Sequence, residues 1–298
     1  MTSSVFDKPV RAEQHGAARL NDFIRKPGIV HVLLTLAACS LSMGAVLLTR
    51  GTGDVAAVWP VNAILLIVVL RWPKAEWPAL FGCLFMGNIL ANVVIGDPWV
   101  RSLILTMANS LEVLIVALIL SRNSAPNITR KSGILRLFAA SLIACSISTP
   151  IALAGLAVTG AALPLQDSAL WFFGDILGLL LFAPLLWALL TKRKTGNDIG
   201  WMSALEGLLV VVVTIGVFVQ SNYPLLFLVP PVLVPLTFRH GVRGAAVALL
   251  LVTMISIGFT YAGMGPTMLA EGGIVHHMLV LQAFLAANSY MALSLGAS

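Results

Sequence analysis

Charged residues are scarce in this chain: they make up 10% of its 298 residues, whereas hydrophobic residues make up 59%. Because soluble domains carry about 25% charged residues, this scarcity excludes an ordinary water-soluble fold.

Cysteines are also few. Cys39, Cys83 and Cys145 lie in separate apolar stretches, so neither a disulfide framework nor a cysteine zinc site is expected. We interpret them as small buried hydrophobic residues.

Catalytic and nucleotide-binding motifs are missing as well. We find no Walker loop, dinucleotide glycine fingerprint, nucleophile elbow or metalloprotease helix. We therefore expect no enzymatic activity in the residues present, no cofactor and no metal. The net charge of +6 does not indicate nucleic-acid binding, because the basic residues occupy short segments between apolar runs and form no stripe.

Long apolar runs dominate the sequence. A helix needs about 20 apolar residues to cross the hydrocarbon core, so these runs predict an all-α, polytopic transmembrane bundle. We favour ten spans, with eight or nine left open, near 29–48, 57–72, 77–95, 101–120, 134–159, 169–190, 204–220, 224–238, 242–262 and 275–296. The run at 224–238 is short and contains Pro224, Pro230, Pro231 and Pro235, so it is either a kinked helix or a re-entrant segment.

The distribution of Lys and Arg predicts the orientation. With ten spans, one side of the membrane receives Arg50 and Arg101, and the other side receives every other basic residue. Because positive residues concentrate in cytoplasmic loops, both termini are predicted to be cytoplasmic. Residues 1–28 lack the apolar core and cleavage site of a signal peptide, so we expect a cytoplasmic tail followed by a membrane domain over 29–298.

Two carboxylates lie inside the apolar runs, Glu112 and Asp175. A charged side chain at the membrane centre costs roughly 2.5 to 3.5 kcal/mol on insertion scales, so such residues usually mark a function or a buried partner. No Lys or Arg falls inside a predicted span to neutralise them. We expect Glu112 to be protonated, hydrogen-bonded to amides, or balanced by a bound cation or amine.

Amide side chains occupy similar depths. Asn88 and Asn92 are four residues apart, and Asn109 is three residues from Glu112, so each pair shares one helix face. Counted at about 1.5 Å per residue, most of these positions lie between the outer face and the midplane, which predicts a pocket opening outward. The predicted pocket residues are Trp59, Asn62, Asn88, Asn92, Asn109, Glu112, Trp171 and Asp175. Hydrogen bonds that merely join helices, worth about 0.6 kcal/mol each, are the alternative interpretation.

The sequence has three further features, which are two more amides, a glycine pair and a histidine doublet. Gln282 and Asn288 add polar groups to the last run, and Gly174-x-x-x-Gly178 is a spacing that lets neighbouring backbones approach closely. His276 and His277 point about 100° apart on a helix, so they cannot share a metal as residues four apart would. We expect them to be interfacial, with ligand or pH sensing as the alternative.

Several segments resemble the membrane-associated sensor domain called MASE, first type. They are Trp59-Pro60-Val61-Asn62-Ala63, Phe85-Met86-Gly87-Asn88, Ala108-Asn109-Ser110-Leu111-Glu112 and Trp171-Phe172-Phe173-Gly174-Asp175-Ile176-Leu177-Gly178, followed by Ala183-Pro184-Leu185-Leu186. The resemblance covers about 29–296. It implies a bacterial inner-membrane input module, usually N-terminal to a cytoplasmic diguanylate cyclase, which makes cyclic di-GMP, or to a two-component histidine kinase. A homodimer and an unidentified small ligand are the implied partners.

From this resemblance we expect the polar pocket to have two arrangements, with the last helix carrying the change to an output. Because the sequence stops within an apolar run at Ser298, we expect a truncated chain whose natural form continues into that output. The main alternative is a small-solute or ion transporter or a substrate-binding membrane subunit, since intramembrane carboxylates and broken helices also mark transport pathways. A scaffold that binds another membrane protein is a third possibility. An intramembrane enzyme has the least support, because no nucleophile or base accompanies the acids.

Overall fold

The computed structural model describes residues 27–49, 56–122, 127–160, 162–191 and 200–297. Within these residues every regular element is helical, which confirms the all-α prediction. The α-helices are α2 (Pro27–Thr49), α3 (Val61–Arg71), α4 (Trp77–Ile95), α5 (Trp99–Leu120), α6 (Lys131–Val158), α7 (Leu165–Leu190), α8 (Trp201–Phe218), α9 (Val229–Tyr261) and α10 (Ile274–Gly296). Short 3-10 turns, η1 (Lys74–Glu76), η2 (Leu225–Leu228) and η3 (Pro266–Leu269), precede α4, α9 and α10. The predicted tail falls almost wholly outside the described residues.

Eight of the described segments are long and apolar enough to cross a membrane, and the 11-residue α3 is a shorter apolar helix. The difference from ten arises partly at α9, which includes most of both predicted spans, 224–238 and 242–262. Gly241 interrupts α9 with φ 61° and ψ −145°, a conformation that favours glycine. A methyl group on Gly244 would lie 2.1 Å from the carbonyl oxygen of Leu236, whereas a straight helix separates such positions by about 12 Å. The chain therefore reverses at Gly241, and α9 is a hairpin of two helical arms.

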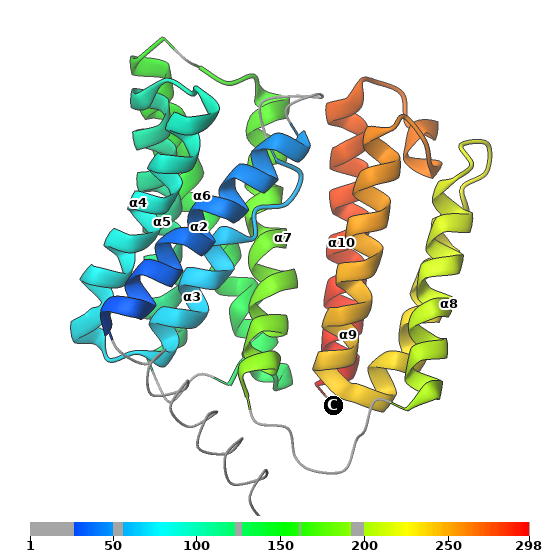
Figure 1. Cartoon of the computed structure of the whole chain (residues 1–298). Helices are drawn as coiled ribbons and strands as arrows, with labels where there is room; N and C mark the ends of the chain where they lie inside the picture. The colour runs from blue at the N-terminus through cyan, green and yellow to red at the C-terminus, as the bar shows by residue number, and fades with distance from the viewer. Residues whose placement is uncertain (1–26, 50–55, 123–126, 161, 192–199, 298) are drawn as a thin grey trace, which may run out of the picture.

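The helices form two groups, with α2 to α6 packed on one side of α7 and α8 to α10 on the other (Figure 1). Each group has its own hydrophobic core, and α7 contributes to both. Ile176 and Leu180 face the core shared with α3 and α5, while Leu177 and Leu181 face the core shared with α9 and α10. Apolar residues all round a helix are typical of a fully buried one. As a result, α7 places the residues around Asp175 at the centre of the bundle.

The two glycines of the Gly174-x-x-x-Gly178 pattern make room for backbone, as predicted, but that backbone is not helical. Residues 56–60 precede α3 in a non-helical conformation, and Trp59 N–H donates to Gly174 O at 3.1 Å. A methyl group on Gly178 would lie 1.9 Å from the Trp59 carbonyl oxygen. The segment thus lies in a groove on α7 that only glycine provides, and it fixes where α3 begins.

Arg71 anchors the other end of α3. Its guanidinium donates to Leu190 O at 3.2 Å and to Thr191 Oγ1 at 3.0 Å, and it lies 4.8 Å from the centroid of the Trp187 ring. α3 is therefore fastened to α7 at both ends, which holds its side chains at a defined depth. Helix α2 begins and α10 ends at the same end of the bundle (Figure 1). The assignment of that end to the cytoplasm remains a prediction.

Candidate functional site

The two intramembrane acids come together at the centre of the bundle. Glu112 lies on α5 with 0% of its side chain exposed, and Asp175 lies on α7 with 1% exposed. Their carboxyl groups lie close enough to interact with each other. Since α5 and α7 are separated in sequence by all of α6, tertiary packing alone creates this acid pair.

Two donors from other helices hold Glu112. Asn62 Nδ2, in the first turn of α3, donates to Oε1 at 3.1 Å, and Ser148 Oγ on α6 donates to Oε2 at 3.5 Å. The Cys145 thiol on α6 also lies beside the Glu112 carboxyl group. Glu112 therefore contacts polar groups from three neighbouring helices. Ser148 and Cys145 were not predicted as site residues, although their spacing of three places them on one helix face.

The site holds more acceptors than donors. Both carboxyl oxygens of Asp175 and the amide oxygen of Asn62 are buried without a hydrogen-bond donor among the described residues. Two ionised carboxylates can only accept, so a hydrogen bond between Glu112 and Asp175 requires a proton on one of them. Unpaired buried acceptors are costly. This set of oxygens is therefore chemically suited to a proton or a small cation.

The α4 amides are engaged elsewhere. Asn88 is buried and its Oδ1 accepts a hydrogen bond from Ser42 Oγ, which joins α4 to α2. Asn92 is half-buried, and its backbone carbonyl accepts from Asp97 N at 2.9 Å at the end of α4. Asn109 is buried one turn from Glu112, and its Oδ1 lacks a donor among the described residues. The structure gathers Asn62, Glu112 and Asp175 from the predicted set, whereas Asn88 binds α2.

The predicted tryptophans lie close to the same part of α7. Trp59 belongs to the segment that crosses Gly174 and Gly178, and its Nε1 is buried without an acceptor among the described residues. Trp171 is buried in the core of the α8 to α10 group. Each ring thus packs into a different core on either side of α7.

Gln282 connects the last helix to this centre. Its Nε2 on α10 donates to Ala57 O at 2.8 Å and to Leu170 O at 2.9 Å. One side chain thereby links α10, the segment 56–60 and α7. Asn288, the other polar residue noted in this run, donates to Phe284 O of its own helix at 2.8 Å.

The histidine doublet lies at the start of α10, where His276 is exposed and His277 Nε2 is 3.1 Å from Ala270 O. Across the described parts of the chain, no three His, Cys, Asp or Glu side chains are arranged to hold a metal ion. The expected interfacial position of His276 and His277, with ligand or pH sensing as the alternative, stays a prediction.

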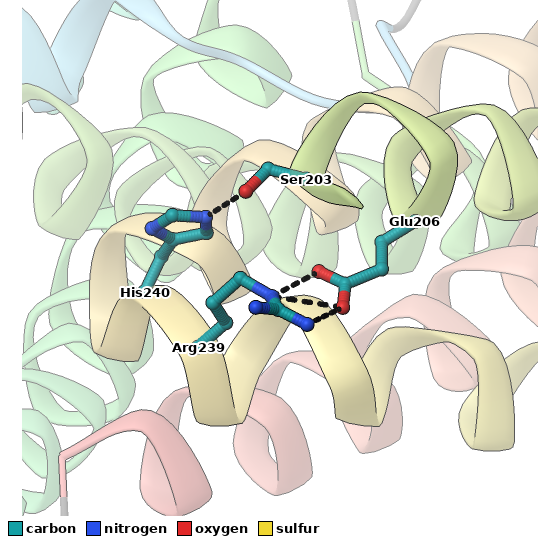
Figure 2. A network of polar contacts seen from close by, with 4 residues as sticks. All are labelled: Ser203, Glu206, Arg239 and His240. Atoms are coloured by element: carbon teal, nitrogen blue, oxygen red, sulfur yellow. Dashed lines mark hydrogen bonds and ion pairs between the residues drawn. The ribbon is translucent and has the colours of Figure 1, made fainter. Parts of the chain in front are cut away.

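A second polar cluster, which the sequence patterns did not indicate, joins α8 to the first arm of α9 (Figure 2). Ser203 Oγ lies 2.6 Å from His240 Nε2. Arg239 and Glu206 form an ion pair with three N–O contacts of 2.8 to 3.1 Å. These contacts fasten α8 beside the reversal at Gly241.

Fold and site together define a polytopic helical membrane protein with an acid pair enclosed at its centre. Comparison with known families agrees: the MASE1 family model matches residues 30–298, nearly the whole chain. The chain belongs to the MASE1 family of membrane-associated sensory domains, which are input rather than catalytic domains. Neither the curated proteins nor the solved structures include a significant match to it.

Proposed function

We propose that the chain is the sensory input module of a bacterial inner-membrane signalling protein and regulates a cytoplasmic output, either a diguanylate cyclase or a histidine kinase. Membership of the MASE1 family supports the sensory class. Both outputs work as dimers, so the proposed unit is a homodimer with both termini in the cytoplasm. The observation that carries the proposal is the pairing of Glu112 with Asp175.

The proposed stimulus is a change in the proton or cation that is bound to the carboxyl groups of Glu112 and Asp175. A cation, a protonated amine or a proton that enters among these oxygens satisfies acceptors that the protein leaves without donors. The protein would then have two conformations. In the one described above the acid pair is enclosed, and in the other the pair is open to the outer side of the membrane. A ligand shifts such an equilibrium only by its difference in affinity for the two arrangements. The hydrogen-bond acceptors around Asp175 that lack donors would bind a cation or proton more tightly in one arrangement than in the other.

Gln282 provides the proposed connection to the output. Asp175 follows Gly174, whose carbonyl accepts from Trp59 N, and Gln282 donates to Ala57 O in the same segment. A movement of α7 relative to residues 56–60 would change hydrogen bonds on α10. Because α10 is the last helix, its displacement is the natural signal to a domain that follows it.

The test is a fusion of the chain, through α10, to a diguanylate cyclase domain, with cyclic di-GMP measured in cells across pH values, salts and amines. We expect Asp175→Asn and Glu112→Gln to abolish the response to the stimulus that changes wild-type output. Asp167→Asn is the matched control, since Asp167 lies on the same helix in its first turn and is half-buried. If wild type and both acid variants respond alike to every effective stimulus, the pair is not the sensor.

A small-solute or ion transporter is the second candidate, and one observation favours it. Non-helical backbone that lines a site within the membrane is typical of transporters, and here the non-helical residues 56–60 lie directly against α7 at Gly174 and Gly178, beside Asp175. Purified protein in liposomes would then catalyse counterflow of a labelled cation or amine. Counterflow that Asp175→Asn abolishes would favour transport over sensing.

A further inference from the structure

A pocket of about 170 Å³ lies between α8 and the two arms of α9, on a different helix pair from the acid pair. Its polar lining consists of Ser203, His240 and Arg243. Gly207, Val247 and Leu251 belong to its apolar lining. The cavity is therefore amphipathic, with basic groups at the reversal of α9 and hydrocarbon walls along the second arm.

The charge available in this pocket comes mainly from Arg243. Glu206 already neutralises the neighbouring Arg239 (Figure 2). Arg243 instead donates from Nη2 to the carbonyl oxygen of Ala188, a neutral acceptor, and no acidic side chain among the described residues pairs with it. Ser203 lies in the first turn of α8, where the helix dipole adds positive potential. The polar end of the pocket thus favours an anion.

The apolar walls indicate what carries that anion. From Arg243 to Leu251 the second arm of α9 rises about 12 Å, so the walls continue from the basic end toward the membrane interior. Trp201, 75% exposed at the same end of α8, is a typical anchor at the headgroup level. An inorganic anion would fill the polar end only, whereas a phospholipid supplies both a phosphate and a chain.

We propose that this pocket binds an anionic phospholipid of the surrounding leaflet. Its phosphate lies against Arg243 and the Ser203–His240 pair, and the first part of an acyl chain lies over Gly207, Val247 and Leu251. Basic pockets between transmembrane helices recognise acidic headgroups in this manner. Such a lipid would bridge α8 and both arms of α9 at the point where the helix reverses.

The test uses the purified 298-residue chain in mild detergent, titrated with phosphatidylglycerol and with phosphatidylcholine of the same chains, while native mass spectrometry counts bound lipid. We expect phosphatidylglycerol to bind at least about tenfold more tightly, and Arg243→Gln to remove about tenfold of its affinity, as expected for loss of charged hydrogen bonds. Arg136→Gln is the matched control, because Arg136 also donates from Nη2 to a helix carbonyl, that of Ile119, at 3.2 Å. It should bind as wild type does.

A second pair of variants tests the acyl-chain part without removing a charge. Gly207 lines the pocket, and a Cβ atom added there would meet no atom within 4 Å, so Gly207→Leu places a bulky side chain at the pocket wall without a clash at its Cβ. Gly216→Leu is its control, because a Cβ atom at Gly216 also meets no atom within 4 Å and Gly216 lies on the opposite face of α8. We expect Gly207→Leu to lose phosphatidylglycerol binding and Gly216→Leu to retain it, with both eluting as folded protein.

Three outcomes would overturn the proposal. Equal binding of the two lipids removes the anionic preference, and equal effects of Arg243→Gln and Arg136→Gln remove the assigned contact. The third is competition by millimolar inorganic phosphate together with full binding by Gly207→Leu. That result would assign the polar end to a free anion.

Discussion

Replacing Gly178 by alanine tests the feature on which the whole site depends, the close contact between α7 and residues 56–60. A methyl group there would lie 1.9 Å from Trp59 O and 2.6 Å from the carbonyl carbon of Trp59. These are backbone atoms, so no side-chain rotation relieves the overlap. The segment must move away from α7, and the hydrogen bond from Trp59 N to Gly174 O must lengthen or break.

The expected magnitude combines three effects. Overpacking of this kind typically costs about 1 to 3 kcal/mol, and loss of one backbone hydrogen bond costs about 0.5 to 1.5 kcal/mol. Alanine is better than glycine inside a helix by about 0.8 to 1.0 kcal/mol, which offsets part of the cost. We therefore expect Gly178→Ala to destabilise the protein by about 1 to 3 kcal/mol.

Gly82→Ala is the matched control, since an added methyl group on α4 meets nothing within 4 Å. It should be neutral or slightly stabilising. Thermal unfolding in detergent can be followed with a thiol-reactive dye once the half-buried Cys39 and Cys83 are replaced by serine in both proteins, because the remaining Cys145 is fully buried in the folded protein. The argument for a glycine-specific groove on α7 is wrong if Gly178→Ala unfolds at the same temperature as Gly82→Ala.

Three further outcomes are expected. Asp175→Asn should lose any stimulus response and raise the unfolding temperature, because an amide replaces one of two facing acids and can donate a hydrogen bond to Glu112. A lower unfolding temperature would contradict the idea that the two acids destabilise the fold. Gln282→Leu should cost about 1 kcal/mol, for two interhelical hydrogen bonds of about 0.6 kcal/mol each, and should uncouple the cyclase fusion; unchanged coupling would remove Gln282 from the proposed route. In a cysteine-free background, a membrane-impermeant maleimide added to intact spheroplasts should label Asp97→Cys but not Glu76→Cys, and the opposite pattern would invert the predicted orientation.

The helical segments follow from the sequence almost directly, since a run of about 20 apolar residues is stable across a membrane only as a helix. The predicted span 77–95 coincides with α4 (Trp77–Ile95). The predicted span 57–72 is wrong at its start, because α3 begins at Val61. Residues 56–60 are as apolar as a helix would require, but Pro60 disfavours a helical conformation at Trp59, and the segment packs against Gly174 and Gly178 of α7 instead.

The site was partly predictable for a similar reason. The cost of a carboxylate in hydrocarbon marks Glu112 and Asp175 from their positions inside apolar runs of the sequence. Ser148 and Cys145 were missed, because small polar residues are common in membrane helices and carry no such cost. The partner of Asn88 was missed too, since a depth along one helix does not say which neighbouring helix its side chain faces.

By itself the sequence determined the membrane class, the helical segments and the two acids worth attention, because hydrophobicity and the cost of charge act locally along the chain. The tertiary structure decided that Glu112 and Asp175 meet, that Asn62 and Ser148 hold Glu112, and that α9 reverses at Gly241. These features depend on which helices pack together. Among helices of similar hydrophobicity, glycine contacts and shared hydrogen bonds make that choice, and they form only when distant segments meet.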